Sequence, residues 1–217
     1  MRGARFLLVC AVCLLLAGGC GGDGDAEPVE EPTASPSPQA SSTSQLTTYT
    51  NEEWGFSLEY PAEWIEEEQG AFGNAEAAIS FHEPELDGDQ VKAMLEGAAW
   101  VSVGTDLLPR AGSASDAREV LEAFRSYLVD RSGKAPTPGN PYFEITESRI
   151  GEFAGVPCLF VDRSSELDRL KGHAIHTRSH TFVTGDVLYV LELHCLDSCW
   201  RENEAQLEAI ADSFVLL

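Results

Sequence analysis

Residues 54–64, WGFSLEYPAEW, carry the most informative structural pattern in the chain. Phe56, Leu58 and Tyr60 alternate with polar residues, which predicts a half-buried strand because successive strand side chains point to opposite faces. Pro61 ends this strand, since proline has no N–H to donate to a sheet. Trp64 then begins a short return strand, so the stretch predicts two consecutive strands.

The rest of residues 49–217 continues with strands and helices in separate runs. Apolar patterning predicts strands over 76–82, 100–103, 143–150, 156–161, 174–184 and 187–195. Apolar residues at steps of three and four predict helices over 89–96 and 116–131, and a final helix that Asp197 caps. The continuous apolar strand 156–161 is expected to be central and buried on both faces. This order predicts an α+β fold, in which an antiparallel β-sheet packs against helices.

Short motifs in this region resemble PsbP-like domains. The opening stretch is similar to the GFSLxYPxxW start of those domains, and residues 185–189 (GDVLY) and 210–214 (IADSF) resemble their late hairpin and their end. The resemblance implies a PsbP-like α/β sandwich over residues 49–217. It also implies a non-enzymatic binding or assembly-assisting module. The motifs are structural, so no catalytic or ligand residue is carried over from them.

The N-terminus has the layout of an export signal. Two arginines precede the apolar run 6–17, which is too short to span a bilayer as a helix, since that takes ~20 residues. The small residues that follow, ending in Cys20, resemble a bacterial lipobox. That resemblance implies a lipoprotein signal peptide over residues 1–19 and acylation of Cys20. An ordinary secreted protein with a plain thiol at Cys20 is the alternative.

Residues 20–48 are expected to be a disordered, lipid-anchored tether. They are rich in Pro, Ser, Thr and acids and contain no aromatic residue, so they cannot bury enough apolar surface to fold. The whole chain has 36 acidic against 14 basic residues and a net charge of −22. That charge argues against a nucleic-acid partner, because phosphate backbones are bound by clustered Lys and Arg. The sequence therefore predicts a protein held by lipid at the extracytoplasmic face of the cell membrane.

Three cysteines lie in the predicted domain, namely Cys158, Cys195 and Cys199. An odd number of thiols in an oxidising compartment predicts one disulfide and one free thiol. Cys195 and Cys199 are favoured, because a strand end meets a helix start there. Pairing of Cys158 with either of the other two stays open.

The histidine-rich stretch 173–180 suggests a metal site. A two-residue turn at Gly185-Asp186 would place His176 opposite Cys195, so His176, Cys195 and Cys199 could form a small soft-metal site. Metal sites need three or four convergent ligands, and strand histidines without a metal are the simpler interpretation. No cofactor and no metal are expected.

No catalytic motif is present in the sequence. The acidic residues 66–68 and the pair Glu83 and Glu85 could act as paired carboxylates in hydrolysis, although glutamates on a strand edge are usually solvated. We therefore expect a non-catalytic binding or assembly module whose partner is an envelope protein or a small ligand. An extracytoplasmic hydrolase or metal-binding protein that uses the Glu pairs or the His/Cys set is the alternative.

Overall fold

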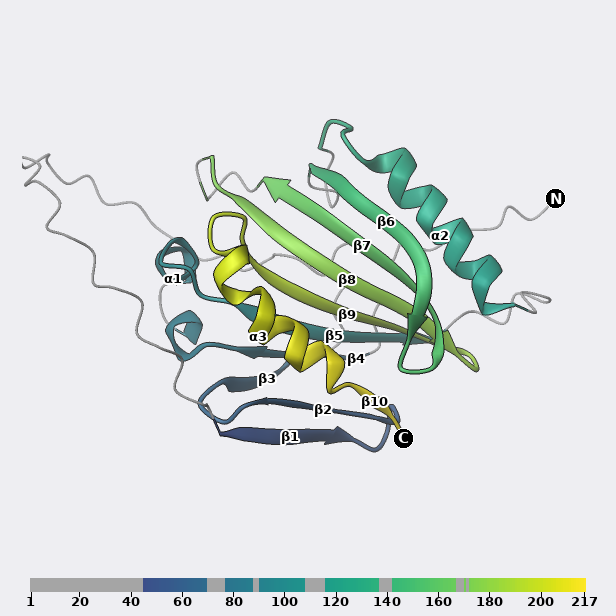
Figure 1. Cartoon of the computed structure of the whole chain (residues 1–217), viewed down its shortest axis with the longest axis horizontal. Coiled ribbons are helices and arrows are strands. Elements are labelled where there is room, and N and C mark those ends of the chain that lie inside the picture. Colours follow the sequence, from purple (N-terminus) through teal and green to yellow (C-terminus); the bar gives the residue numbers. More distant parts are fainter. Residues whose placement is uncertain are drawn as a thin grey trace, which may run out of the picture.

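The computed structural model describes residues 45–69, 77–87, 90–107, 116–136, 142–166, 170 and 172–217. Their main element is a seven-stranded antiparallel sheet in the order β3-β4-β5-β9-β8-β7-β6 (Figure 1). Its strands are β3 (Ile65–Gln69), β4 (Ala77–His82), β5 (Trp100–Leu107), β6 (Phe143–Phe153), β7 (Val156–Glu166), β8 (Ala174–Thr184) and β9 (Val187–Leu196). The predicted signal peptide, Cys20 and most of the predicted tether lie outside the described residues.

A smaller sheet joins the two ends of the domain. It has the order β1-β2-β10, with strands β1 (Leu46–Asn51), β2 (Phe56–Pro61) and β10 (Val215–Leu216). β1 begins inside the stretch predicted to be tether, and the reason is its antiparallel pairing with β2, in which Thr48 lies opposite Glu59. Backbone pairing orders these polar residues, which the composition of the stretch did not indicate.

Helices cover both faces of the large sheet. α3 (Trp200–Asp212) packs on β9 together with β2, and its apolar side joins the core around Phe56, Phe81, Leu191 and Leu193. α2 (Ala117–Arg131) packs on the other face, over Leu159 and Val161 of β7. We call these the α3 face and the α2 face. α1 (Gln90–Leu95) and the 3₁₀ turn η1 (Pro84–Asp87) cover a third cluster near Leu196. No helix in the described parts of the chain is long and apolar enough to cross a membrane.

The predicted α+β class and several local predictions are confirmed. The predicted helix over 116–131 is α2, and Asp116 caps it by accepting a hydrogen bond from the N–H of Arg118. The last two long strands form the predicted hairpin, with Thr184 paired with Val187 and His176 with Cys195.

Two local predictions are wrong. Cys199, not Asp197, is the N-cap residue of α3 and makes no side-chain cap bond, because the Asp197 carboxylate instead accepts a hydrogen bond from Ser164 and pairs with His176. β7 is not central but lies next to the edge strand β6. Its Phe160 is only partly buried, so the strand is not covered evenly on both faces.

A bulge in β6 determines which of its side chains face α3. Ile145 pairs with Arg163 and Glu147 pairs with Asp162, so Thr146 is the extra residue. An added residue reverses the alternation of a strand. Ile145 therefore packs with the α2-face cluster, whereas Glu147 and the alternate residues after it turn to the α3 face.

Candidate functional site

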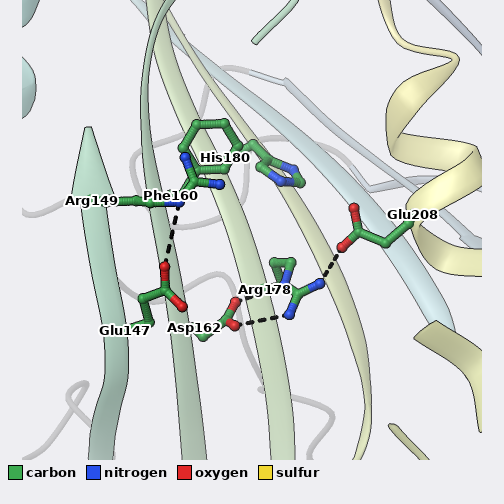
Figure 2. Close-up of a pocket in the computed structure, with 7 residues that line it drawn as sticks. All are labelled: Glu147, Arg149, Phe160, Asp162, Arg178, His180 and Glu208. Carbon is green, nitrogen blue, oxygen red and sulfur yellow. Dashed lines mark hydrogen bonds and ion pairs between the residues drawn. The ribbon is translucent and has the colours of Figure 1, made fainter. Parts of the chain in front are cut away.

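A pocket of about 230 Å³ opens on the α3 face of the sheet. Figure 2 shows its side chains converging from three neighbouring strands and from α3. The lining residues are Glu147 and Arg149 of β6, Phe160 and Asp162 of β7, Arg178 and His180 of β8, and Glu208 of α3. In each strand they are alternate residues, which share one face of a sheet.

Arg178 is the central cation of the pocket. Its Nε and Nη2 donate to the two oxygens of Asp162 at 2.8 and 3.0 Å, in the bidentate geometry that a guanidinium favours. Its Nη1 donates to Glu204 at 3.0 Å and to Glu208. The bond to Asp162 is the main cause that raises the pKa of Arg178 further above its ordinary value. Three carboxylates thus surround one guanidinium.

Arg149 lies over the ring of its cross-strand partner Phe160, with its guanidinium carbon 4.0 Å from the ring centroid. Its other contact is an ion pair with Glu147, whose nearest N–O distance is 3.4 Å, and 57% of its side chain is exposed. Gly151, two residues further along β6, leaves room for this stack. A Cβ there would lie 2.8 Å from Arg149 Nη1 and 3.0 Å from the Phe160 ring.

His180 lines the pocket with a buried aromatic ring. It is 3% exposed and stacks on Phe153 with the ring centroids 4.7 Å apart. Burial lowers the pKa of His180 to about 4, so the ring is neutral at pH 7. Its Nδ1 is buried and has no hydrogen-bond partner among the residues that the structure describes, and a buried polar atom without a partner is costly.

The pocket combines an excess of negative charge with aromatic faces. Glu147, Asp162 and Glu208 outnumber the two arginines that line it, and Glu204 adds a further acid beside Arg178. The carboxylate of Asp162 is held by both of its oxygens, so it is not free to act as a base. The arrangement is therefore suited to holding a charged group.

Sequence reasoning did not select the residues that line this pocket. The sequence did contain a pattern that could have indicated them. Arg178 lies between His176 and His180 on one face of β8, and Asp162 lies two residues after Phe160 in β7. Charged residues at alternate positions on the buried side of a strand need partners. The sequence did not indicate that α3 supplies one of those partners, Glu208.

The structure places the predicted metal candidates apart from this pocket. His176 pairs with Asp197 at 3.5 Å and packs on the Trp200 ring. Cys195 is fully buried and is the cross-strand partner of His176. Cys199 lies against Gly97. Within the described parts of the chain, no group of three or more His, Cys, Asp or Glu side chains is placed to hold a metal ion.

All three cysteines of the domain are free thiols in the structure. Burial raises the pKa of Cys195 to about 12, and the neighbouring Cys199 adds to this shift. Burial also raises the pKa of Cys158 to about 12. Cys195 and Cys199 are thus close enough to interact, and Cys158 is a core residue.

The candidate glutamates behave differently from one another. Residues 66–68 lie along the edge strand β3 with exposed side chains, and Glu66 accepts a hydrogen bond from the Tyr60 hydroxyl at 3.1 Å. Burial raises the pKa of Glu83 to about 7, with Glu85 as the second cause. Neither Glu83 nor Glu85 lines the described pocket.

A buried polar cluster on the α2 face was also missed from the sequence. His194 is fully buried, and its two ring nitrogens lie 3.2 Å from Ser102 Oγ and 3.1 Å from Thr177 Oγ1. Burial lowers the pKa of His194 to about 3. Glu192, beside it, pairs with Arg163 at 2.7 Å. A serine next to a histidine is found in hydrolases, but this pair is closed to solvent, so we interpret the cluster as structural.

Comparison with known proteins bears on the fold. No family model and no curated protein matches the sequence. The solution structure of cyanobacterial PsbP (CyanoP) from Synechocystis sp. PCC 6803 is similar, with a TM-score of 0.54 at 16% identity over 81% of this chain and 95% of that chain. The chain thus has the α+β fold of this PsbP structure.

Two further solved structures have a similar arrangement. LpqN, described as involved in cell envelope biogenesis of Mycobacterium tuberculosis, has a TM-score of 0.47 at 14% identity and covers 79% of this chain and 90% of its own. The Ran-binding protein Mog1p of Saccharomyces cerevisiae has a TM-score of 0.47 at 10% identity, over 80% and 96% of the two chains. At such identities the similarity concerns the fold alone.

Proposed function

We propose that this protein is a lipid-anchored extracytoplasmic binding module that acts through the pocket on its α3 face. The observation that carries the proposal is the convergence of charged and aromatic side chains from β6, β7, β8 and α3 on one hollow. Mobile surface charges rarely keep such geometry, whereas these side chains are held by bidentate and stacked contacts. A pocket with pre-arranged polar groups is the default binding-site hypothesis for an unassigned fold.

The sequence supports the location. The apolar run 6–17, the lipobox-like ending at Cys20 and the Pro-, Ser- and Thr-rich stretch that precedes β1 fit an exported domain on a lipid anchor. Two or more acyl chains on Cys20 would provide stable attachment, where one chain binds only marginally. The acidic domain itself would be repelled by anionic lipid, so the lipid alone would hold it at the membrane.

Attachment is tested by replacing Cys20 with Ser and fractionating the cells. We expect the variant to leave the membrane fraction while a Cys158→Ser control stays in it. Co-sedimentation of the Cys20→Ser variant with membranes would show that lipid is not the anchor.

Binding is tested by site-specific photo-cross-linking of the intact protein in its own cell envelope. A photo-reactive residue replaces Glu147 at the pocket, and in a second strain it replaces Glu119, which is exposed on α2. We expect a recurring adduct from position 147 that is absent from position 119. Adducts of equal yield from both positions, or none from position 147, would contradict a binding module that acts through the α3 face.

One observation favours the hydrolase alternative, namely the raised pKa of Glu83. A perturbed carboxyl is a reasonable sign of catalysis only when it faces a site that substrate can enter. Glu83 and Glu85 follow β4 at the start of η1, away from the residues that line the pocket. We therefore propose a non-catalytic role.

A further inference from the structure

We propose that the pocket binds a single cationic group, an ammonium or a guanidinium about the size of one amino-acid side chain. This inference rests on the proposed function and adds the chemistry of the ligand. The group could be carried by a free amine or by a basic side chain of a protein partner. Its recognition would be the same in both cases.

The charge balance around Arg178 is the first argument. The guanidinium of Arg178 bonds to three carboxylates, those of Asp162, Glu204 and Glu208. One positive charge is therefore surrounded by three negative charges. The side chains of Asp162 and Glu208 are 17% and 32% exposed, and partly buried charges are screened less than exposed ones. A second cation in the pocket would be attracted by this excess.

The aromatic faces are the second argument. The pocket already holds a cation over a ring, because Arg149 covers Phe160 at 4.0 Å. Arg178 also lies 5.1 Å from the ring centroid of Trp200, which does not line the pocket. Cations bind ring faces through the quadrupole of the π-system. Arg149 is mostly exposed and is held by a single ion pair, so a ligand cation could displace it from Phe160.

His180 is the third argument, and it is independent of the charges. Its ring lines the pocket, is 3% exposed and has a buried Nδ1 without a hydrogen-bond partner. A neutral imidazole can accept a hydrogen bond from an N–H donor and does not repel a cation. In the tautomer that carries its proton on Nε2, the unpartnered Nδ1 is an acceptor, and an ammonium or guanidinium would supply its donor.

The size of the pocket limits the ligand. A volume of about 230 Å³ is below the ~300–1,000 Å³ of typical small-molecule sites. It suits the end of one side chain rather than a nucleotide, a sugar chain or a folded segment.

The test is calorimetric titration of the full chain in non-ionic detergent with two probes. Agmatine, which carries an ammonium at one end and a guanidinium at the other, represents a free amine, and an acetylated and amidated Gly-Arg-Gly peptide represents a protein side chain. Glutarate is the anionic control. We expect the wild type to bind at least one cationic probe and not glutarate. Binding of the peptide alone would assign the cation to a partner protein, and binding of agmatine, with or without the peptide, would show that a free amine is sufficient.

Two charge variants should shift the affinity in opposite directions. Glu208→Gln removes an acid and should weaken cation binding by about tenfold, whereas Arg149→Ala removes the competing internal cation and should strengthen it by about threefold. Glu202→Gln is the matched control, because Glu202 is an exposed acid on the same helix. It should change affinity less than twofold.

Several results would overturn the inference. These are glutarate binding that is lost in Arg149→Ala, equal effects of Glu208→Gln and Glu202→Gln, or no binding of either cationic probe. Circular dichroism verifies that each variant is folded. If Glu208→Gln unfolds, Glu147→Gln at the exposed rim replaces it with the same expected direction. If position 147 gives a specific cross-link but neither cationic probe binds, the inference of a cation ligand is rejected, and the proposed binding module still stands.

Discussion

The guanidinium carbon of Arg149 lies 4.0 Å from the centroid of the Phe160 ring, and the two residues are direct partners in the β6–β7 ladder. Cross-strand neighbours share a face, so this stack needs Arg149 to point to the α3 face. The bulge at Thr146 gives it that direction. A backbone irregularity at the sheet edge thus places a cation over an aromatic ring inside the pocket.

Gly151 should be needed for this stack. Gly151→Ala adds a Cβ 2.8 Å from Arg149 Nη1, and we expect Arg149 to move off Phe160 at a cost of about 1 kcal/mol. Thermal unfolding measures the loss, and the ring-current shift of the Arg149 Nε–H reports the displacement. The same substitution in an Arg149→Ala background should cost less. An equal cost in both backgrounds would show that Gly151 serves another purpose.

Arg178 should be essential to stability because it neutralises the partly buried carboxylate of Asp162. Arg178→Ala leaves Asp162 without its bidentate partner, and we expect a loss of about 2–4 kcal/mol in urea unfolding. Arg178→Lys should recover only part of this, since an ammonium lacks the planar fork. Arg118→Ala, at an exposed position of α2, should lie within about 0.5 kcal/mol of wild type. Equal losses for residues 178 and 118 would contradict the role of Arg178.

The buried residues His180 and His194 should respond oppositely to the same substitution. His180→Phe removes a ring nitrogen without a partner and keeps a ring on Phe153, so stability should be unchanged or rise by about 0.5–1 kcal/mol. His194→Phe breaks the contacts with Ser102 and Thr177 and should cost about 2–4 kcal/mol. Chemical denaturation measures both. A destabilised His180→Phe would mean that the ring is mainly structural, and a stable variant should also bind agmatine less well.

Glu83 should make the protein less stable as pH rises. Its folded pKa is about 7 against an ordinary value of 4.5, so the folded state keeps a proton that the unfolded chain releases. The stabilisation is present below about pH 4.5 and is lost as pH rises through 7. Glu83→Gln should therefore match wild type at pH 4 and exceed it at pH 8 by about 1–2 kcal/mol. Glu119→Gln, at an exposed position of α2, is the control, and a constant difference between Glu83→Gln and wild type across this range would refute the shift.

Cys195 and Cys199 should form a disulfide in exported material. Non-reducing peptide mass spectrometry should show these two residues linked and Cys158 alkylated only after denaturation, because Cys158 is fully buried. Protein kept in reductant is the control. A linked Cys158, or three free thiols in exported protein, would rule out this pairing.

Much of the fold followed from local patterns in the sequence. The alternation at 56–60, the turn at Gly185-Asp186 and the capped helix after Asp116 each specify an element through short-range geometry, and all are found where expected. The register that places His176 opposite Cys195 also followed, since a two-residue turn fixes every later pair.

Other features depended on contacts that local patterns do not encode. β1 starts at Leu46 because it pairs with β2, and β7 lies near the edge because β6 returns beside it. Asp197 does not cap α3, because Ser164 and His176 engage its carboxylate. In each case a contact with a residue distant in sequence outweighs the local structural preference.

By itself the sequence determined the α+β class, most strand and helix positions and the hairpin register, because hydrophobic period and turn chemistry act over a few residues. Only the tertiary structure decided the pocket. The bulge at Thr146 reverses which side chains of β6 face α3, and packing of α3 on the sheet brings Glu208 to Arg178. Both depend on how strands and a helix meet in space, so the charges that define the site converge only in the folded chain.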